Sequence, residues 1–201
     1  MHQPPDSKNS DSKALLRQDL RKKRSDLPLQ QRMNHDLAIQ KHMLALVQTQ
    51  GARKIACYWP FNGEPDLIPL CRDLLDQGCE IALPVISENL RGSMQFFSWQ
   101  KDTQLIKNRF GIFEPTTKAP VRISEFDILV IPLVAYDLKG NRVGMGAGYY
   151  DRHLEALRTQ PAPLRVGAAY RLQEIAAIER NKWDIPLHGV VNERGWFTFV
   201  Q

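Results

Sequence analysis

Three glycines at every second position, Gly144, Gly146 and Gly148, form the stretch of the chain best suited to bind an anion. Because glycine carries no side chain, backbone N–H groups can approach an anion closely there. Arg142 places a fixed positive charge just before the glycines, and Asp151 places a carboxylate just after them. A carboxylate in that position suits a Mg²⁺ that accompanies a nucleotide. The residue types therefore predict a site for the phosphates of a nucleotide.

The glycine stretch lies between a predicted strand and a predicted helix. The nearly continuous apolar run 126–135 indicates a buried strand. Tyr150, Leu154 and Leu157 recur at helical spacing, and a helix that starts here points its positive end at the bound anion. The alternative is a tight strand-to-helix crossover that needs only the permissive backbone of glycine. The stretch has neither the Lys-Ser/Thr ending of a Walker loop nor the dinucleotide-binding spacing.

The whole motif from Arg142 to Asp151, Arg-x-Gly-x-Gly-x-Gly-Tyr-Tyr-Asp, resembles the signature of 5-formyltetrahydrofolate cyclo-ligases, also called methenyltetrahydrofolate synthetases. Four or five separated segments between Lys13 and Glu193 agree with this family. The resemblance implies an ATP- and Mg²⁺-dependent ligase that converts 5-formyltetrahydrofolate to 5,10-methenyltetrahydrofolate and releases ADP and phosphate. Phosphorylation of the formyl oxygen is the activating step in this scheme, and it requires mostly alignment and charge neutralisation from the protein.

Lys13 and Arg17 stand four positions apart and therefore share one face of a predicted helix. We expect residues 1–12 to be a disordered polar tail whose last serines cap this helix, and residues 13–201 to form the domain. One interpretation of the two basic residues is a solvated face. The other is a pair of phosphate contacts. The family resemblance favours this interpretation, because members of that family have a similar Lys-x-x-x-Arg near the N-terminus that contacts ATP.

A loop with two aromatic residues and an acid follows a strand predicted over 53–59. Ligands of open α/β sheets bind at the carboxyl ends of strands, where this loop lies. Trp59 and Phe61 can stack on a flat heterocycle, and Glu64 can accept a hydrogen bond from its N–H edge. The alternative is an aromatic cluster at the rim of the core, with Glu64 as an acid at the start of the next helix. The Pro-x-x-x-Glu pattern is similar to the folate-binding segment of the family, which favours the first interpretation.

Two further segments resemble the family. The segment 110–115 is similar to its Gly-Ile-x-Glu-Pro loop, where Glu114 is alternatively a simple turn acid. The tail matches an Asp-x-Pro-Leu…Val-Val-x-Glu pattern that contains Asp184, and the rigid segment after Asp184 can carry it to the cleft that holds Asp151. Two aspartates are enough for a Mg²⁺ whose other ligands are phosphate and water. His188 stands where relatives usually carry an aspartate, and a lone histidine is more often structural.

The expected site can be stated as a set of residues. It comprises, for ATP, Lys13, Arg17, Arg142, Gly144, Gly146, Gly148 and Tyr150; for the reduced folate, Trp59, Glu64, Met145 and Tyr149; for Mg²⁺, Asp151 and Asp184; and for catalysis, Arg142 and Tyr149.

Strands that alternate with helices predict a single α/β domain around a mainly parallel sheet flanked by helices. The resemblance implies a fold like that of the sugar-phosphate isomerases and CoA transferases. Besides the elements above, we expect helices over 67–76 and up to about residue 50, and strands over 79–85, 94–99 and 164–170. The inward side chains of the helix that ends near residue 50 should be Leu37, Met43, Leu44 and Val47.

Composition excludes several classes of protein. The chain has 201 residues, of which 43% are hydrophobic and 24% charged, as in ordinary soluble globular domains. There is neither an apolar run long enough to cross a bilayer nor a signal-peptide pattern, so we expect a cytoplasmic protein. The three cysteines form no CxxC pair and sit in apolar surroundings, which predicts buried, reduced thiols.

The net charge of +5 raises the question of nucleic acid, but no RNA-binding aromatic signature accompanies it. Small polyanions such as ATP and a glutamate-tailed folate also suit this charge. We therefore expect a monomer with small-molecule partners and neither nucleic acid nor membrane. The rival interpretation is a non-catalytic nucleotide- or RNA-binding module that uses the same glycine stretch and basic helix.

Overall fold

A computed structural model describes residues 7–86, 93–117, 120–155, 163–181 and 184–199. The side chains of residues 7–11 are not part of this description. Within these ranges, the α-helices are α1 (Ser7–Ser25), α2 (Leu29–Gln50), α3 (Ile68–Asp76) and α4 (Tyr149–Glu155). Short 3₁₀ turns occupy Ile123–Glu125 and Arg171–Gln173.

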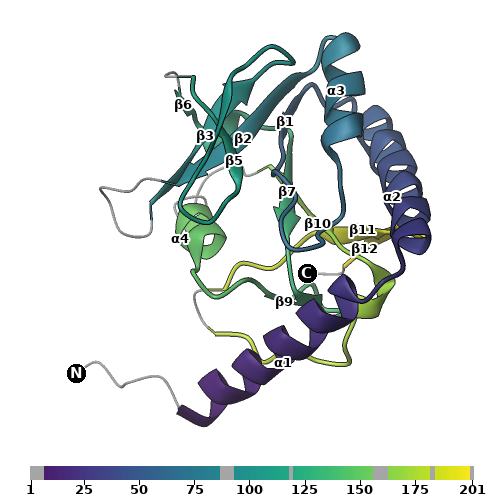
Figure 1. The fold of residues 1–201 in the computed structure, drawn as a ribbon, viewed down its shortest axis with the longest axis vertical. Helices are drawn as coiled ribbons and strands as arrows, with labels where there is room; N and C mark the ends of the chain where they lie inside the picture. The colour runs from purple at the N-terminus through teal and green to yellow at the C-terminus, as the bar shows by residue number, and fades with distance from the viewer. Residues whose placement is uncertain (1–6, 87–92, 118–119, 156–162, 182–183, 200–201) are drawn as a thin grey trace.

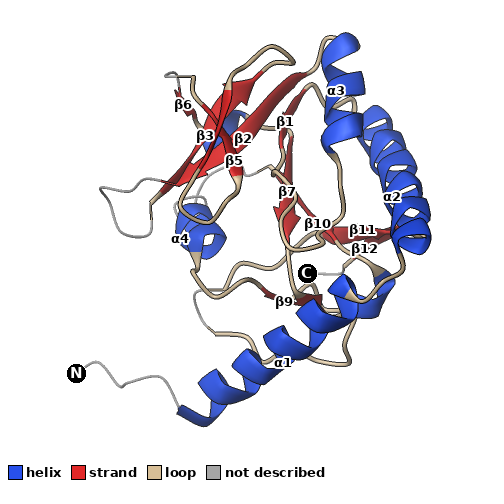
Figure 2. Cartoon of the chain, viewed as in Figure 1, coloured by secondary structure: helices blue, strands red, loops and turns tan. Residues whose placement is uncertain are grey.

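One eight-stranded sheet forms the centre of the molecule (Figures 1 and 2). Its strands, in spatial order, are β12 (Gly195–Thr198), β11 (Gly189–Asn192), β10 (Leu164–Ala168), β7 (Ile128–Pro132), β1 (Lys54–Ala56), β2 (Glu80–Ile86), β3 (Met94–Trp99) and β6 (Pro120–Val121). The strands from β11 to β2 are parallel, and antiparallel strands complete both edges. The predicted α/β domain with a mainly parallel sheet flanked by helices is confirmed.

Two small hairpins lie outside this sheet. They pair β4 (Leu105–Lys107) with β5 (Phe113–Pro115), and β8 (Ala135–Tyr136) with β9 (Arg142–Val143). The second hairpin leads directly into the glycine stretch. The first places its strand β5 beside the carboxyl end of β2, as the bond from Ile86 N–H to the Glu114 carboxylate shows.

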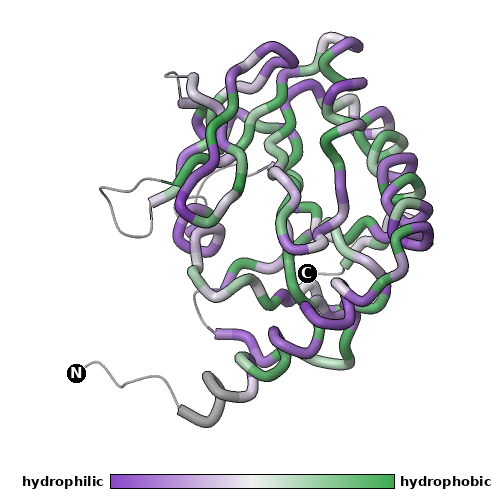
Figure 3. Tube along the Cα trace, viewed as in Figure 1, coloured by the Kyte–Doolittle hydropathy of each residue, from purple (hydrophilic) through white to green (hydrophobic). Residues whose placement is uncertain are grey.

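Both faces of the sheet are buried, which explains the nearly continuous apolar run of β7. Ile128 and Val130 pack into the cluster that α2 and α3 complete, whereas Leu129 and Ile131 pack into the cluster that contains Leu154 of α4. Alternate residues of one strand thus face opposite layers. In Figure 1, α2 and α3 lie on one side of the sheet and α4 on the other. The central strands are mostly hydrophobic in Figure 3, whereas hydrophobic and hydrophilic residues alternate along α2.

Helix α1 crosses the end of the sheet rather than covering a face (Figure 1). Its Leu20 packs with Val134 and Ala135 and with Val143 of β9. This contact brings a helix from the N-terminus against the segment that leads into the glycine stretch.

Several predicted boundaries need correction. Helix α1 begins at Ser7, six residues before the predicted start at Lys13, and the serines expected to cap the helix lie inside it. Residues 1–6 lie outside the described part of the chain. The strands predicted over 53–59 and 164–170 are shorter in the structure, where β1 covers Lys54–Ala56 and β10 covers Leu164–Ala168.

One predicted core residue is wrong. Leu37 is 63% exposed, because the buried stripe of α2 runs through Ile39, Met43, Leu46 and Val47, and a position two residues before Ile39 points to the opposite side. Met43 and Val47 are buried as predicted, and Leu44 is partly buried. Leu157 lies outside the described residues.

The cysteine prediction is confirmed, since Cys57, Cys71 and Cys79 are free and buried. None of the helices in the described part of the chain combines the length and the apolar character that crossing a membrane requires.

Candidate active site

A cavity of about 300 Å³ opens at the carboxyl ends of β1, β2 and β7. Its walls come from the loop after β1, the turn between β4 and β5, and the glycine stretch with the start of α4. The predicted site residues among its lining are Trp59, Glu64, Arg142, Gly144, Met145, Gly148, Tyr149, Tyr150 and Asp151. Lys13, Arg17, Gly146 and Asp184 do not line it. The fold therefore brings the two predicted binding segments, far apart in sequence, to one cavity.

Glu64 is a buried acid in the wall of this cavity. Its side-chain Oε2 accepts the N–H of Phe61 at 3.0 Å. Burial raises the pKa of Glu64 to about 7, while the charges of Arg24 and Arg21 oppose that rise. The acid at the start of α3 is instead Asp66, whose Oδ1 accepts the N–H of Ile68 at 2.9 Å. Glu64 thus faces the cavity and does not cap the next helix.

Trp59 combines both roles that were considered for it. Its ring lines the cavity, and it also packs edge-on against Trp99, with ring centroids 6.3 Å apart, and against Phe113 at 5.1 Å. The core contacts hold the indole in one orientation, so the face that remains in the cavity is presented rigidly to a flat ligand.

The glycine stretch adopts a backbone that other residues rarely accept. Gly146 and Gly148 have φ values of 106° and 66°, in the region that favours glycine. A Cβ on Gly148 would lie 2.8 Å from an Arg152 side-chain nitrogen. That arginine donates to the Ala147 carbonyl at 2.6 Å and so holds the loop in shape. Glycines are therefore favoured at both positions because of the backbone conformation that the turn requires.

Arg142 connects the parts of the site. Its side chain is only 4% exposed, and it forms an ion pair with Asp151 and a hydrogen bond to the Ile185 carbonyl. Asp184 immediately precedes Ile185, so Arg142 brings the tail segment toward Asp151. The Oδ2 atom of Asp184 accepts two hydrogen bonds from Asn181, at 2.8 and 3.2 Å.

Asp151 and Asp184, the two carboxylates predicted to bind Mg²⁺, are not part of a larger group of metal-binding side chains in the described residues. Within the described ranges, no group of three or more histidine, cysteine or acidic side chains is placed to hold a metal ion. Asp151 retains one oxygen beyond its ion pair, lies in the cavity wall and is 29% exposed. One or two carboxylates completed by phosphate oxygens and water suit Mg²⁺, so the residues present fit this ion.

Arg17 of α1 lies against the glycine stretch. Its Nε donates to the Gly144 carbonyl at 2.9 Å, and Gly146 faces its guanidinium. Arg17 is thus partly buried at the loop rather than fully solvated, and Lys13 lies one helical turn earlier on the same side. A second groove lies along α1 beside Asn62, and Arg17, Arg21 and Lys22 line it.

The cavity also contains residues that sequence reasoning did not assign. Glu114 is 5% exposed and accepts hydrogen bonds from Ile86 N–H at 2.9 Å and Asn108 Nδ2 at 2.7 Å. It fastens the turn between β4 and β5 to the end of β2, and so is more than a turn acid. Asn108 closes that turn by accepting the N–H groups of Phe110 and Ile112. The resemblance to the Gly-Ile-x-Glu-Pro loop was the sequence signal that could have indicated a role for Glu114. Its contact with β2, however, depends on the fold.

The Tyr150 hydroxyl is a free hydrogen-bonding group at this site. It is buried and has no hydrogen-bond partner among the residues that the structure describes. Burial raises its pKa well above the usual value, so the hydroxyl keeps its proton at neutral pH. Tyr150 lines the cavity, although its hydroxyl oxygen itself is closed off from solvent.

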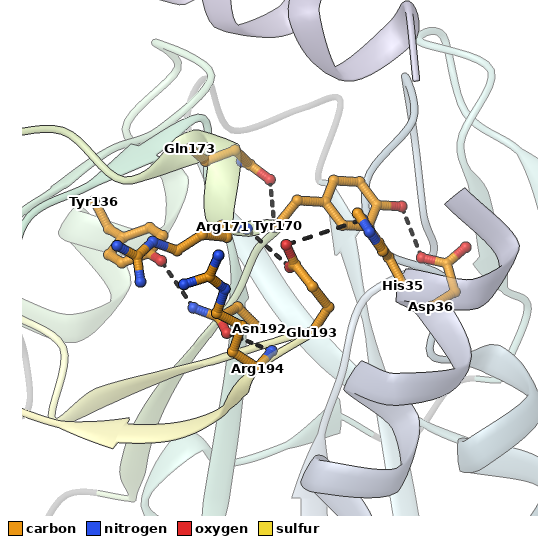
Figure 4. Close-up of polar contacts among 9 residues, drawn as sticks. All are labelled: His35, Asp36, Tyr136, Tyr170, Arg171, Gln173, Asn192, Glu193 and Arg194. Atoms are coloured by element: carbon orange, nitrogen blue, oxygen red, sulfur yellow. Dashed lines mark hydrogen bonds and ion pairs between the residues drawn. The ribbon is translucent and has the colours of Figure 1, made fainter. Parts of the chain in front are cut away.

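The last residue of the tail motif, Glu193, belongs to a separate polar network (Figure 4). Glu193 accepts the N–H of Arg171 at 2.9 Å, and Tyr170 donates to Asp36 of α2 at 2.7 Å. Asn192 donates to the Tyr136 hydroxyl at 3.0 Å. These bonds tie α2 to the ends of β10 and β11, and none of the residues lines the cavity. The network is therefore structural.

His188 also has a structural place. Its Nδ1 accepts the Arg165 N–H at 2.8 Å, a bond that requires a neutral ring. Burial, followed by the charge of Arg165, lowers the pKa of His188 to about 4.

This pKa predicts a loss of stability in acid. As the pH falls from 6.5 toward about 4, the unfolded chain binds a proton at His188 that the folded chain excludes, so the folded state loses stability over that window. His188→Asn keeps an acceptor for the Arg165 N–H without titrating. We expect its melting temperature to fall less steeply over that window than that of the wild type, with His42→Asn as the matched control. Parallel slopes in both variants and the wild type would contradict the prediction.

A glycine loop, a buried arginine and aromatic side chains meet in one cavity at the carboxyl ends of a parallel sheet, which is where α/β proteins bind their ligands. A family model described as the 5-formyltetrahydrofolate cyclo-ligase family matches residues 9–193, and the chain belongs to this family. It is an enzyme of the cyclo-ligase class.

The relatives agree over almost the whole chain. The 5-formyltetrahydrofolate cyclo-ligase of Haemophilus influenzae is 34% identical over 185 residues, which cover 91% of this chain and 98% of that protein. The enzyme of the same name from Escherichia coli is 34% identical over 86% of this chain and 95% of its own. The NMR structure of Aquifex aeolicus 5,10-methenyltetrahydrofolate synthetase superimposes with a TM-score of 0.81 at 31% identity, covering 94% of this chain and 93% of that one.

Proposed function

We propose that the chain converts 5-formyltetrahydrofolate to 5,10-methenyltetrahydrofolate, with ATP as the second substrate and Mg²⁺ as the cofactor. The observation that carries this proposal is one cavity with two unlike walls. Arg142 and the glycine stretch supply the charged wall, and Trp59 and Glu64 supply the wall for a heterocycle. The family to which the chain belongs supports the same substrate.

The reaction must activate a poor leaving group. Transfer of the γ-phosphoryl group of ATP to the formyl oxygen releases ADP and makes the formyl carbon electrophilic. Nitrogen 10 of the folate then attacks that carbon, its proton is lost, and the C–O bond breaks to release phosphate. Such a transfer needs alignment and neutralisation of charge more than covalent help from the protein.

The phosphates of ATP are assigned to the charged wall. Backbone N–H groups of the glycine stretch and the guanidinium of Arg142 would face them, with Arg17 and Lys13 approaching from α1. The contact between Arg17 and the Gly144 carbonyl supports this, because it places a cation beside the loop. Bound Mg²⁺, held by Asp151 and Asp184, would neutralise phosphate charge.

The folate is assigned to the aromatic wall. Trp59 offers a fixed face for stacking, and the second carboxylate oxygen of Glu64 accepts no hydrogen bond from the residues that the structure describes. That oxygen can accept N–H groups of a pterin-like ring. Met145 and Tyr149 also line the cavity, and both are adjacent to glycines of the stretch, where the reacting groups would meet.

The direct test is spectrophotometric. Purified protein mixed with 5-formyltetrahydrofolate should generate the absorbance of methenyltetrahydrofolate only when ATP and Mg²⁺ are present, and EDTA should stop the signal. Binding of ATP or RNA with no absorbance change would instead support the non-catalytic module.

A separate prediction concerns Lys13 and Arg17. Replacement of either with alanine should raise KM for ATP by about tenfold or more, since a hydrogen bond to a charged group contributes roughly 1.5–3 kcal/mol. KM for the folate should stay close to the wild-type value. Lys23→Ala, which removes an exposed cation of the same helix, is the control. An unchanged KM for ATP in both variants would show that Lys13 and Arg17 do not bind ATP and belong to a solvated face of the helix.

A further inference from the structure

Arg24 is a buried cation that the proposed reaction does not use. It lies near the end of α1 and is only 1% exposed. No carboxylate in the described part of the chain forms an ion pair with it. Its hydrogen bonds go to two backbone carbonyls: Nε and Nη2 donate to Asn62 at 3.1 and 2.8 Å, and Nη1 donates to Leu133 at 3.2 Å. Removing a charge from water without an ion-pair partner is costly, so a function for this charge is expected.

The Asn62 carbonyl belongs to the turn that carries Glu64. Asn62 has a φ of 50° and Gly63 a φ of 73°, so two successive residues adopt the left-handed region. The turn closes on itself through the bond from Glu64 N–H to the Phe61 carbonyl at 3.1 Å and the bond from Phe61 N–H to the Glu64 carboxylate. Arg24 stabilises this turn, because its Nε and Nη2 both donate hydrogen bonds to the Asn62 carbonyl oxygen.

The Leu133 carbonyl fixes the other end of the contact. Leu133 directly follows β7, whose last residue, Pro132, lines the cavity. Arg24 therefore joins α1, the Phe61–Glu64 turn and the end of a central strand. Since Arg17 of the same helix contacts the glycine stretch, α1 links the two walls of the cavity.

The charge of Arg24 also acts on Glu64. Burial raises the pKa of Glu64, and Arg24 is the first of the charges that oppose the rise, ahead of Arg21. The charge of Glu64 also acts on the hydroxyls of Tyr58 and Tyr150, which burial keeps protonated. The other charged residues that line the same cavity are Glu114, Arg142 and Asp151. A ligand that fills the cavity removes further water from Glu64 and disfavours its charged form. Arg24 lies out of reach of solvent, so its charge remains unscreened when the ligand binds.

We propose that Arg24 is a positioning residue for the substrate cavity: it fixes the Phe61–Glu64 turn and favours the ionised form of the Glu64 carboxylate, so that Glu64 can accept the N–H groups of the bound heterocycle. The identity of that heterocycle as a reduced folate rests on the proposed function. Arg24 contacts neither substrate and acts only through the turn and through Glu64.

The test compares Arg24→Gln with Lys23→Gln, the same chemical change one residue away on the exposed face. KM and kcat for 5-formyltetrahydrofolate are measured from acidic to mildly alkaline pH at saturating ATP. In Arg24→Gln, the pH below which the KM for folate rises should move upward by about one unit or more, because a nearby opposite charge lowers a carboxyl pKa by roughly 1–3 units. KM for ATP should stay within about twofold of the wild type. Lys23→Gln should behave as the wild type.

Two further variants separate the possible failures. In a Glu64→Gln background, Arg24→Gln should shift no pH midpoint, because the titrating group is gone. Arg24→Lys keeps the charge but loses the forked contact, so it should keep the wild-type midpoint with a raised KM for folate; it also serves if Arg24→Gln does not fold.

Suppose that Glu64→Gln impairs folate binding, whereas the Arg24 variants keep the wild-type KM for folate and the wild-type midpoint of its pH dependence. This result would overturn the role of Arg24 but not the proposed folate site. Wild-type folate binding in Glu64→Gln would overturn the proposed folate site itself.

Discussion

Replacement of Asp151 with asparagine is expected to lower turnover by at least about 100-fold, beyond the roughly 10–100-fold that loss of an outer-shell metal partner costs. Asparagine keeps the shape of the side chain and an oxygen for Arg142, but it removes the charge that would hold Mg²⁺ beside the phosphates. A carboxylate next to phosphates is repulsive unless a cation lies between them. High Mg²⁺ or Mn²⁺ should restore part of the turnover. The melting temperature without nucleotide should fall as well, because the buried Arg142 charge loses its ion-pair partner.

The control for Asp151 is Glu155→Gln, an exposed carboxylate of the same helix. It should retain wild-type turnover and the same dependence on Mg²⁺. Asp184→Asn should resemble Asp151→Asn, because the proposal assigns both aspartates to one ion. The alternative for Asp151 is an acid that favours the start of α4, worth about 0.3–1 kcal/mol of stability. Near-normal turnover with wild-type Mg²⁺ dependence in Asp151→Asn would establish that alternative.

Arg142→Met should reduce kcat by about 10²–10³-fold, the cost of losing a preorganised donor to charge that develops in the transition state. Arg142 is the cation placed in the cavity wall itself, and its ion pair with Asp151 and its bond to the Ile185 carbonyl fix its direction. The substitution retains the apolar length of the side chain but removes both contacts. Steady-state and single-turnover rates of methenyltetrahydrofolate formation measure the effect.

Loss of Arg142 also leaves the partly buried Asp151 carboxylate unpaired, so stability must be followed together with activity. The double variant Arg142→Met with Asp151→Asn removes that unpaired charge and should recover melting temperature without recovering turnover. Arg142→Lys keeps a charge but lacks the fork that reaches Asp151 and Ile185 at once, so it should retain only part of the activity. Wild-type kcat in Arg142→Met would show that the arginine serves only to join the tail to α4.

The residues of the glycine stretch and of the loop after β1 could be identified from sequence, since their signals are local. Alternating glycines, the Tyr-Tyr-Asp that follows them and the aromatic loop at a strand end each lie within about ten residues. The buried strands were equally visible, because a strand covered on both faces, such as β7, must be apolar throughout. The hydrophobic period and the residue preferences of turns depend only on nearby residues. The helices, the strands and the two segments that line the cavity could therefore be predicted from the sequence.

Contacts between distant elements were decided by tertiary structure. Arg17 and Gly144 stand 127 positions apart, and only the docking of α1 on the β8–β9 hairpin brings them together. Arg24 has the same local sequence character as its exposed neighbours Lys22 and Lys23, yet it is buried because two carbonyls from other segments meet it there. The prediction for Leu37 was wrong for the same reason, and the role of Glu114 could not be decided from its local sequence. Whether a side chain faces solvent, a carbonyl or a cavity depends on which elements pack beside it, and the sequence around one residue does not contain that information.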